Sequence, residues 1–294
     1  MGSTPFDHHA SRVQEQGYHS HRGSNHSNVI GEGILRDLRS ASTNLREDLD
    51  AGKVGCWINS KIPFHEGTWD ADVVIAEPDE LTLPPEQRPG ACPVDGAAGI
   101  PGVKPDGRKL RLVMEHKSII TAHRNRINRF KELASDVEYS NDAGYNVIVA
   151  ATILIGTAPR VLQVVDGVRK LYKLPGGGNR YDEERFDREV GNRLRARDPT
   201  IWDQFAGFVS TNRPTDAANT VEYFRRVFPL RSQDRVNQRG MDALMLVPVF
   251  YDNVGTARVD RDHPLGADVD GRYADFIGTL STAYARRWGS TRRG

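Results

Sequence analysis

Apolar positions in the first half of the chain alternate between helical and strand-like periodicity. A helical pattern begins near Ile30 and extends toward Leu49, where an Asp-Ala-Gly turn follows. Short apolar, β-branched segments then predict strands. The predicted elements, in order, are a helix over 29–49, strands over 54–60, 71–77 and 109–117, a helix over 119–137 and a buried strand over 145–155. The order is therefore helix, three strands, helix, strand.

The second half has a less regular pattern and no internal repeat. It predicts a hairpin over 161–174 that turns at Asp166-Gly167, and two or three helices between 183 and 228. A buried strand interrupted by Pro248 is expected over 241–251, and an amphipathic helix over 273–288. Together the halves predict an α/β protein with a mixed central sheet flanked by helices and a mostly helical C-terminal part.

Two segments interrupt this pattern. Residues 1–28 hold five of the nine histidines among Ser, Gly, Asn and Gln, which predicts a flexible arm with little that could pack. Residues 78–108 are rich in Pro and Gly and are expected to form a surface insertion. The expected organisation is this arm, a core over 29–160 that contains the insertion, and a continuation of the fold over 161–294.

The composition restricts the class of protein. The chain has 40 Lys and Arg against 39 Asp and Glu, so a surface that binds nucleic acid must be a local patch. Only 8 of the 40 basic residues are Lys; Arg suits phosphates and guanine edges, although a GC-rich genome would give the same bias. Two cysteines are too few for a disulfide framework. Without an apolar leader or a run of about 18 apolar residues, a soluble cytoplasmic protein with no membrane partner is expected.

Candidate chemistry gathers at the ends of two predicted strands. Side chains alternate along a strand, so Glu115 and Lys117 share one face. Asp72 begins the strand Val73-Val74-Ile75, and if these strands pair, Asp72 meets Glu115; Asp70 is the alternative acid. Two converging carboxylates repel each other unless a hard cation such as Mg²⁺ lies between them. A Lys at that point can orient a water or stabilise charge on a phosphate, while the alternative is a surface ion pair.

These residues resemble the PD-(D/E)XK nuclease superfamily, to which most restriction endonucleases belong. The resemblance rests on Asp72 in DVVIA, on Glu115-His116-Lys117 in LVMEHKS and on Glu32 in GEGILRDL. It implies an αβββαβ core in which Asp72 and Glu115 bind Mg²⁺, with Mn²⁺ as a substitute. It also implies that Lys117 handles the attacking water and that Glu32 assists. Two features depart from the family: Ala71 stands where its name has Pro, and the spacing from Asp72 to Glu115 is long.

Two polar segments are candidates for contacts with DNA. Arg124 and Asn125 follow the Glu115–Lys117 motif and could contact phosphates, although a solvated helix face would have the same residues. A second segment mixes the side chains that read guanine and adenine edges: Arg231, Gln233, Arg235, Asn237, Gln238 and Arg239. The glycines at 176–178 lack the Gly-Lys-Ser/Thr of a phosphate-binding loop, so no nucleotide cofactor is expected.

The sequence thus predicts a Mg²⁺-dependent Type II restriction endonuclease that acts on double-stranded DNA. Residues 161–294 would supply DNA recognition and the contact of a homodimer, since a two-fold pair of sites cuts both strands. One alternative is a repair or recombination nuclease of the same superfamily. Another is a DNA-binding protein that has the nuclease fold but does not cleave, and a third is a protein that binds no nucleic acid.

Overall fold

The structure is a computed structural model of the whole chain. It describes residues 3–20, 25–64, 67–79, 104–122, 126–144, 146–176, 178, 180–232 and 239–289. Most of the insertion expected over 78–108 therefore lies outside the described residues. In the part of the chain that is described, no helix has the length and apolar character needed to cross a bilayer.

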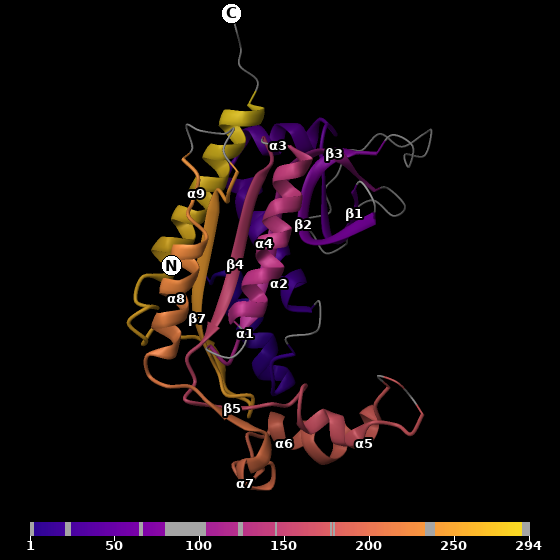
Figure 1. The fold of residues 1–294 in the computed structure, drawn as a ribbon, viewed down its shortest axis with the longest axis vertical. Helices are drawn as coiled ribbons and strands as arrows, with labels where there is room; N and C mark the ends of the chain where they lie inside the picture. Colours follow the sequence, from indigo (N-terminus) through magenta and orange to yellow (C-terminus); the bar gives the residue numbers. More distant parts are fainter. Residues whose placement is uncertain are drawn as a thin grey trace, which may run out of the picture.

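A mixed sheet of six strands forms the centre of the molecule, in the order β1-β2-β3-β4-β7-β8 (Figure 1). Its strands are β1 (Gly55–Phe64), β2 (Gly67–Pro78), β3 (Pro105–Ile119), β4 (Ile148–Gly156), β7 (Ala243–Tyr251) and β8 (Ala257–Val259). The strands β1, β2 and β3 form an antiparallel meander, whereas β4 lies parallel to both β3 and β7. β4 is buried along its entire length, as its unbroken apolar run predicts.

Helices cover both faces of this sheet. One face packs against α1 (Pro5–Gln16), α2 (Asn25–Ala41), α3 (Thr43–Asp50) and α9 (Val269–Trp288). The other face packs against α4 (Arg126–Ala143) and α8 (Asp216–Val227), which lie in front of the sheet in Figure 1. The α/β architecture is confirmed, and so is the order from the helix before β1 to β4.

A third apolar cluster lies beyond the end of the sheet. It contains side chains of the short helices α5 (Glu183–Phe186), α6 (Asn192–Arg195) and α7 (Ile201–Gln204), which Figure 1 places below the strands. A π-helical turn (Asp187–Gly191), two 3₁₀ turns (Val168–Tyr172 and Ala206–Phe208) and the strands β5 (Arg160–Leu162) and β6 (Val209–Thr211) complete the described elements. The hairpin predicted over 161–174 is wrong, because β5 pairs with β6 and the chain turns into the first 3₁₀ segment.

The prediction that residues 1–28 hold little that could pack is also wrong. α1 begins with a capping box, in which the Thr4 hydroxyl accepts from the Asp7 N–H while the Asp7 carboxylate accepts from the Thr4 N–H. The helix ends at Gly17 in a left-handed conformation. His9 and His19 are buried, and the His19 ring stacks on Tyr251 with centroids 5.0 Å apart. The described residues 3–20 therefore pack against the core.

Two helix boundaries differ from the prediction. The helix expected over 29–49 divides into α2 and α3, because Ser42 interrupts it and caps α3 by accepting from the Leu45 N–H. The helix expected from Ile119 begins in the described residues at Arg126, since β3 continues to Ile119 along β4. Just after β3, the backbone of Ile120 approaches the end of β4 closely, because a Cβ on Gly156 would lie 1.9 Å from the Ile120 carbonyl oxygen. The longer strand carries the whole Glu115–Lys117 motif within the sheet.

Candidate active site

Glu115 and Lys117 lie side by side on one face of β3. Their pairing with β4 places both inside the parallel part of the sheet, on the face that packs against α4. Lys117 Nζ donates to Glu115 Oε2 at 2.8 Å, and the two side chains are only 16% and 5% exposed. Strand periodicity predicted that Glu115 and Lys117 are neighbours, and the structure confirms this. The pair is buried, so it is not the surface ion pair considered as the alternative.

Asp72 lies on the neighbouring strand at the matching position. Val73 faces Met114 in the antiparallel register of β2 and β3, so the next pair along the ladder is Asp72 and Glu115. Residues that face each other across two strands direct their side chains to the same face. Asp72 Oδ2 also accepts from the backbone N–H of His116 at 2.7 Å, which fixes the carboxylate beside the motif. The structure thus brings together the three residues that the sequence placed at this site.

Asp136 joins this group from α4 and was not predicted. Its Oδ2 lies 3.1 Å from Lys117 Nζ, and its Oδ1 accepts from Trp69 Nε1 at 3.2 Å. Asp136 comes one turn after the buried Leu133, and its side chain is 14% exposed. Its contact with Lys117 arises from the packing of α4 across β3, so no signal in the local sequence marks it. The candidate site is defined here as Asp72, Glu115, Lys117 and Asp136.

Burial and mutual repulsion shift the protonation of this site. Burial raises the pKa of Glu115 well above its ordinary value; Lys117 opposes this, while the charges of Asp72 and Asp136 add to it. Burial also raises the pKa of Asp136. Burial alone would lower the pKa of Lys117, but the carboxylates around it raise that pKa above its ordinary value. Lys117 is therefore an ammonium at any physiological pH, and the carboxylates compete for one cation.

The donor set fits a hard divalent cation bound by few protein ligands. Glu115 Oε1 is buried and accepts no hydrogen bond from the described residues. Among those residues, no three His, Cys, Asp or Glu side chains are arranged to hold a metal ion. Mg²⁺ commonly binds one or two carboxylates and retains water and phosphate oxygens as its other ligands. Asp72 and Glu115 match that requirement, whereas a structural zinc site would need a fuller set.

The structure does not place Glu32 in this site. α2 packs on the opposite face of the sheet: a Cβ on Gly31 would lie 2.7 Å from Val73 Cγ2 and 3.4 Å from His116 Nε2. His116 alternates with Glu115 and Lys117 along β3, and its Nδ1 lies 2.7 Å from Thr152 Oγ1 on that opposite face. The supporting role that the resemblance implies for Glu32 has no basis in the described contacts.

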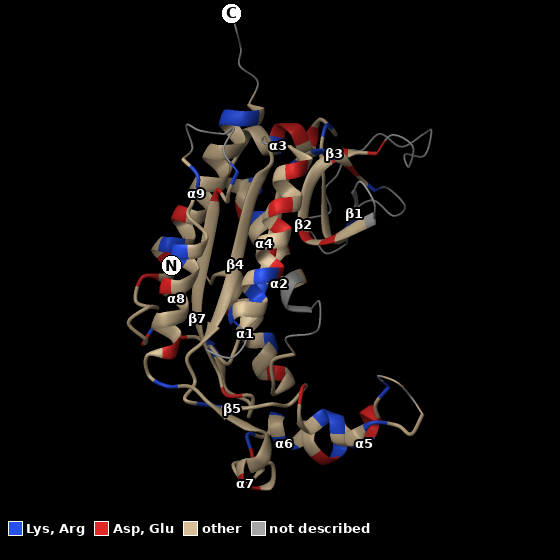
Figure 2. Ribbon diagram, viewed as in Figure 1, with Lys and Arg blue, Asp and Glu red and all other residues tan. Residues whose placement is uncertain are grey.

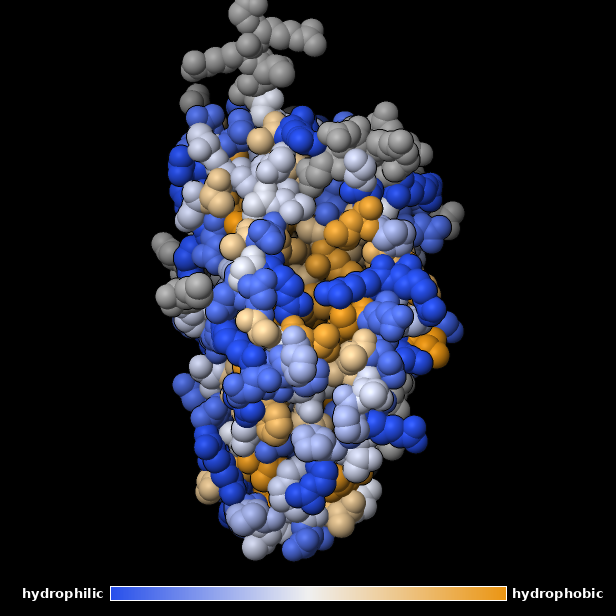
Figure 3. All heavy atoms as spheres, turned by 90° about the vertical axis from the view of Figure 1, so that its left-hand side faces the viewer, coloured by the Kyte–Doolittle hydropathy of each residue, from blue (hydrophilic) through white to orange (hydrophobic). Residues whose placement is uncertain are grey.

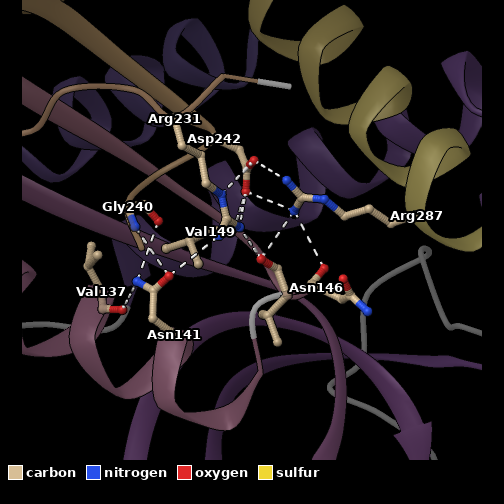
Figure 4. Close-up of polar contacts among 9 residues, drawn as sticks. Val137, Asn141, Asn146, Val149, Arg231, Gly240, Asp242 and Arg287 are labelled. Atoms are coloured by element: carbon tan, nitrogen blue, oxygen red, sulfur yellow. Dashed lines mark hydrogen bonds and ion pairs between the residues drawn. The ribbon is translucent and has the colours of Figure 1, made fainter. Parts of the chain in front are cut away.

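Arg231 was predicted to read DNA bases, and this prediction is wrong. Its side chain is 1% exposed and forms an ion pair with Asp242, with Nη2 2.6 Å from Oδ2 (Figure 4). Arg287 contacts the same carboxylate from α9, with Nη1 3.0 Å from Oδ2. Arg231 also donates to the backbone carbonyl of Val147. It therefore joins the segments just before β4 and β7 to α4 within the core and is buried away from any ligand.

The other residues predicted to contact DNA remain untested. Arg239 is exposed and forms an ion pair with Asp142 at 2.7 Å. Six residues lie outside the described part of the chain: Arg124, Asn125, Gln233, Arg235, Asn237 and Gln238. Comparison of the chain with protein-family models, with curated proteins and with solved structures finds no match.

Proposed function

We propose that the protein is a Mg²⁺-dependent endonuclease that hydrolyses phosphodiester bonds of double-stranded DNA, with Type II restriction as the most specific form of this function. The observation that carries the proposal is the convergence of Asp72 and Glu115 beside the ammonium of Lys117, on adjacent strands of one sheet. The element order from α3 through β1, β2, β3 and α4 to β4 supports the resemblance to an αβββαβ core.

Each residue of the site has a distinct role in this proposal. Asp72 and Glu115 would hold the cation, which supplies charge neutralisation at the phosphate and a bound water of lowered pKa. Lys117 stays protonated, so it serves as a hydrogen-bond donor that orients the attacking water or stabilises charge on the phosphate. Asp136 contacts Lys117 and holds its ammonium near Glu115, which makes Asp136 a positioning residue.

Basic residues near this site support a polyanionic substrate. The N-terminal half of α4 carries Arg126, Arg129 and Lys131 against the single acid Glu132, which pairs with Arg129, whereas the C-terminal half carries only acidic charges; Figure 2 shows this bias along the helix. Lys131 is exposed and has no ion pair among the described residues. Phosphate contacts of this kind give sequence-independent affinity that falls as salt rises. In the Type II form, two copies related by a two-fold axis would cut both strands.

The test is cleavage of supercoiled plasmid DNA in the presence of Mg²⁺. Lys117→Met, Glu115→Gln and Asp72→Asn should each lower the rate by about 100-fold or more, as expected for loss of one preorganised electrostatic contact. Binding of duplex DNA should persist in all three variants and should weaken as salt rises. Lys109→Met is the control, since Lys109 lies on the same strand beyond the register shift between β2 and β3, is half exposed and forms an ion pair with Glu77.

The pattern of products separates the forms of the proposal. Discrete fragments support restriction, whereas smearing or cutting limited to unusual structures supports a repair or recombination nuclease. If the three site variants cleave as fast as the parent, the site assignment is wrong.

A second candidate is a DNA-binding protein that does not cleave. It is favoured by the contacts of Lys117, which two carboxylates surround within 3.1 Å, as in a structural ion-pair cluster. This candidate predicts that divalent cations do not stabilise the protein and that plasmid remains intact under conditions in which it is bound. Cation-dependent cleavage by the parent protein removes it.

A further inference from the structure

The strand β7 has an open edge along its first half. On one side it pairs with β4 from Ala243 to Val249, but on the other side β8 reaches only Val249–Tyr251. Two carbonyl oxygens mark this outer side: Pro248 accepts from the Asp260 N–H at 3.0 Å, and Leu246 accepts from Arg272 Nη1 at 3.5 Å. Backbone groups alternate between the two sides of a parallel strand, so Leu244 and Leu246 direct their N–H groups outward.

A cavity of about 400 Å³ lies against this edge. Apolar side chains form its floor, including Leu244 and Leu246 of the strand, Phe228 after α8 and Phe276 of α9. Figure 3 shows the apolar hollow on this side of the molecule, with a hydrophilic side chain extending across it. Leu230 on its margin is 55% exposed. The edge therefore opens into an apolar groove between two helices instead of facing bulk solvent.

The rim of the groove carries two arginines that form no ion pair in the described part of the chain. Arg225 makes no hydrogen bond or ion pair within the described residues, and Arg272 donates only to the backbone carbonyls of Leu246, Leu265 and Asp268. Burial lowers the pKa of Arg272 and repulsion from Arg225 lowers it further, while the charge of Asp268 acts in the opposite direction. Two carboxylates line the groove in the described part of the chain: Asp242 is held by Arg231 and Arg287, and Asp275 forms no ion pair there. An acidic group on a ligand would relieve this repulsion.

The shape of the site selects a narrow occupant. The edge is recessed between α8 on one face of the sheet and α9 on the other, as Figure 1 shows. A second copy that paired through the same edge would bring its own α8 and α9 against these helices, so two recessed edges could not meet. A single extended chain fits, because it needs only the width of one strand, about 5 Å.

We propose that this groove binds an extended, acidic peptide segment of a partner protein, which adds a strand to β7. The partner backbone would bond to the outward groups of Leu244 and Leu246, and alternate apolar side chains would enter the groove. An Asp or Glu near one end would contact Arg225 and Arg272. This interaction is separate from the proposed nuclease site, whose residues lie on β2, β3 and α4.

The experiment uses a panel of fluorescent peptides, each about eight residues long, in which Val or Ile alternates with Thr and one end carries Asp. Binding is followed by anisotropy, and amide hydrogen exchange is followed for the strand. The amides of Leu244 and Leu246 should exchange faster than those of Met245 and Val247 in the free protein and should become protected by peptide. Peptides N-methylated on the pairing face should bind at least about 10-fold more weakly. A 10-fold change in Kd corresponds to about 1.4 kcal/mol of binding free energy.

Two variants test the edge and the charge independently. Leu244→Pro removes an outward N–H but no hydrogen bond to β4, in the same way that the native Pro248 lacks an outward N–H, and it should abolish peptide binding. Leu244→Val keeps the N–H and should retain peptide binding. Arg225→Glu changes an exposed side chain and should reverse the preference from Asp-ended to Lys-ended peptides. The proposal is overturned if the amides of Leu244 and Leu246 are already protected from exchange before peptide is added. It is also overturned if no peptide of the panel binds, or if Arg225→Glu still prefers Asp-ended to Lys-ended peptides.

Discussion

Asp242→Asn is expected to be one of the most destabilising single substitutions in this fold. Asp242 is fully buried just before β7, where Arg231 and Arg287 both donate to its carboxylate (Figure 4). Its Oδ2 also accepts from the Val149 N–H at 2.9 Å. An Asn side chain leaves two buried guanidinium groups without a counter-charge and replaces one acceptor with a donor. Removing one partner of a buried ion pair costs about 3–5 kcal/mol of the free energy of unfolding.

The assay is denaturation by heat and by guanidinium. For a protein of this size each kcal/mol corresponds to roughly 2–4 °C in Tm, so a fall of about 6–20 °C is expected. Asp142→Asn is the control: it removes the ion pair between Asp142 and Arg239, whose side chains are 36% and 57% exposed. An exposed pair contributes about 1 kcal/mol or less. If the two variants lose the same small amount of stability, the buried cluster does not contribute the free energy expected of a buried ion pair.

Three further results are expected. Burial raises the pKa of Glu115 and Asp136, so their contribution to the free energy of unfolding decreases as pH rises through those raised values. The increase in Tm produced by Mg²⁺ should therefore grow over the same range, and Glu115→Gln should abolish that growth. Thr4→Ala removes the capping box of α1 and should cost about 1 kcal/mol in denaturant unfolding, whereas a truly flexible arm would show no effect. Gly156→Ala places a Cβ 1.9 Å from the Ile120 carbonyl oxygen and should lower the free energy of unfolding by about 1–3 kcal/mol or more. Gly207→Ala, where the added Cβ would have no atom within 4 Å, should change the free energy of unfolding little. Equal losses in the two variants would contradict the close contact at Gly156.

The central strands could be predicted because their sequence pattern depends on burial within the sheet. Val113, Glu115 and Lys117 share a face by the geometry of any strand, so the Glu115–Lys117 neighbourhood needed no tertiary information. Asp72 could be matched to Glu115 only on the assumption that β2 and β3 pair, which the structure confirms. These features follow from local periodicity and one strand pairing.

Features that depend on which helix meets which strand could not be predicted in this way. Asp136 contacts Lys117 only because α4 packs across β3, and no local pattern marks that acid. Arg231 lies among polar residues that suit DNA, but its burial depends on Asp242, eleven positions away. The α1 helix is a different case, since Thr4, Pro5 and Asp7 are local helix-start signals that the His-rich composition obscured.

The two buried charge clusters differ in how their negative charge is balanced, and this difference separates a structural cluster from a candidate site. At Asp242 the hydrogen bonds from Arg231 and Arg287 outweigh the effect of burial and lower the pKa of the carboxyl, so a single anion is fully satisfied. At the candidate site two carboxylates contact the ammonium of Lys117 and the charge of Asp72 also acts on it, while Glu115 Oε1 accepts no hydrogen bond from the described residues. Burial of unbalanced negative charge costs stability, which a purely structural cluster could avoid with Gln or Asn. The imbalance is accounted for if a divalent cation enters the site, and this is the physical reason for proposing the functional site at Glu115 instead of at Asp242.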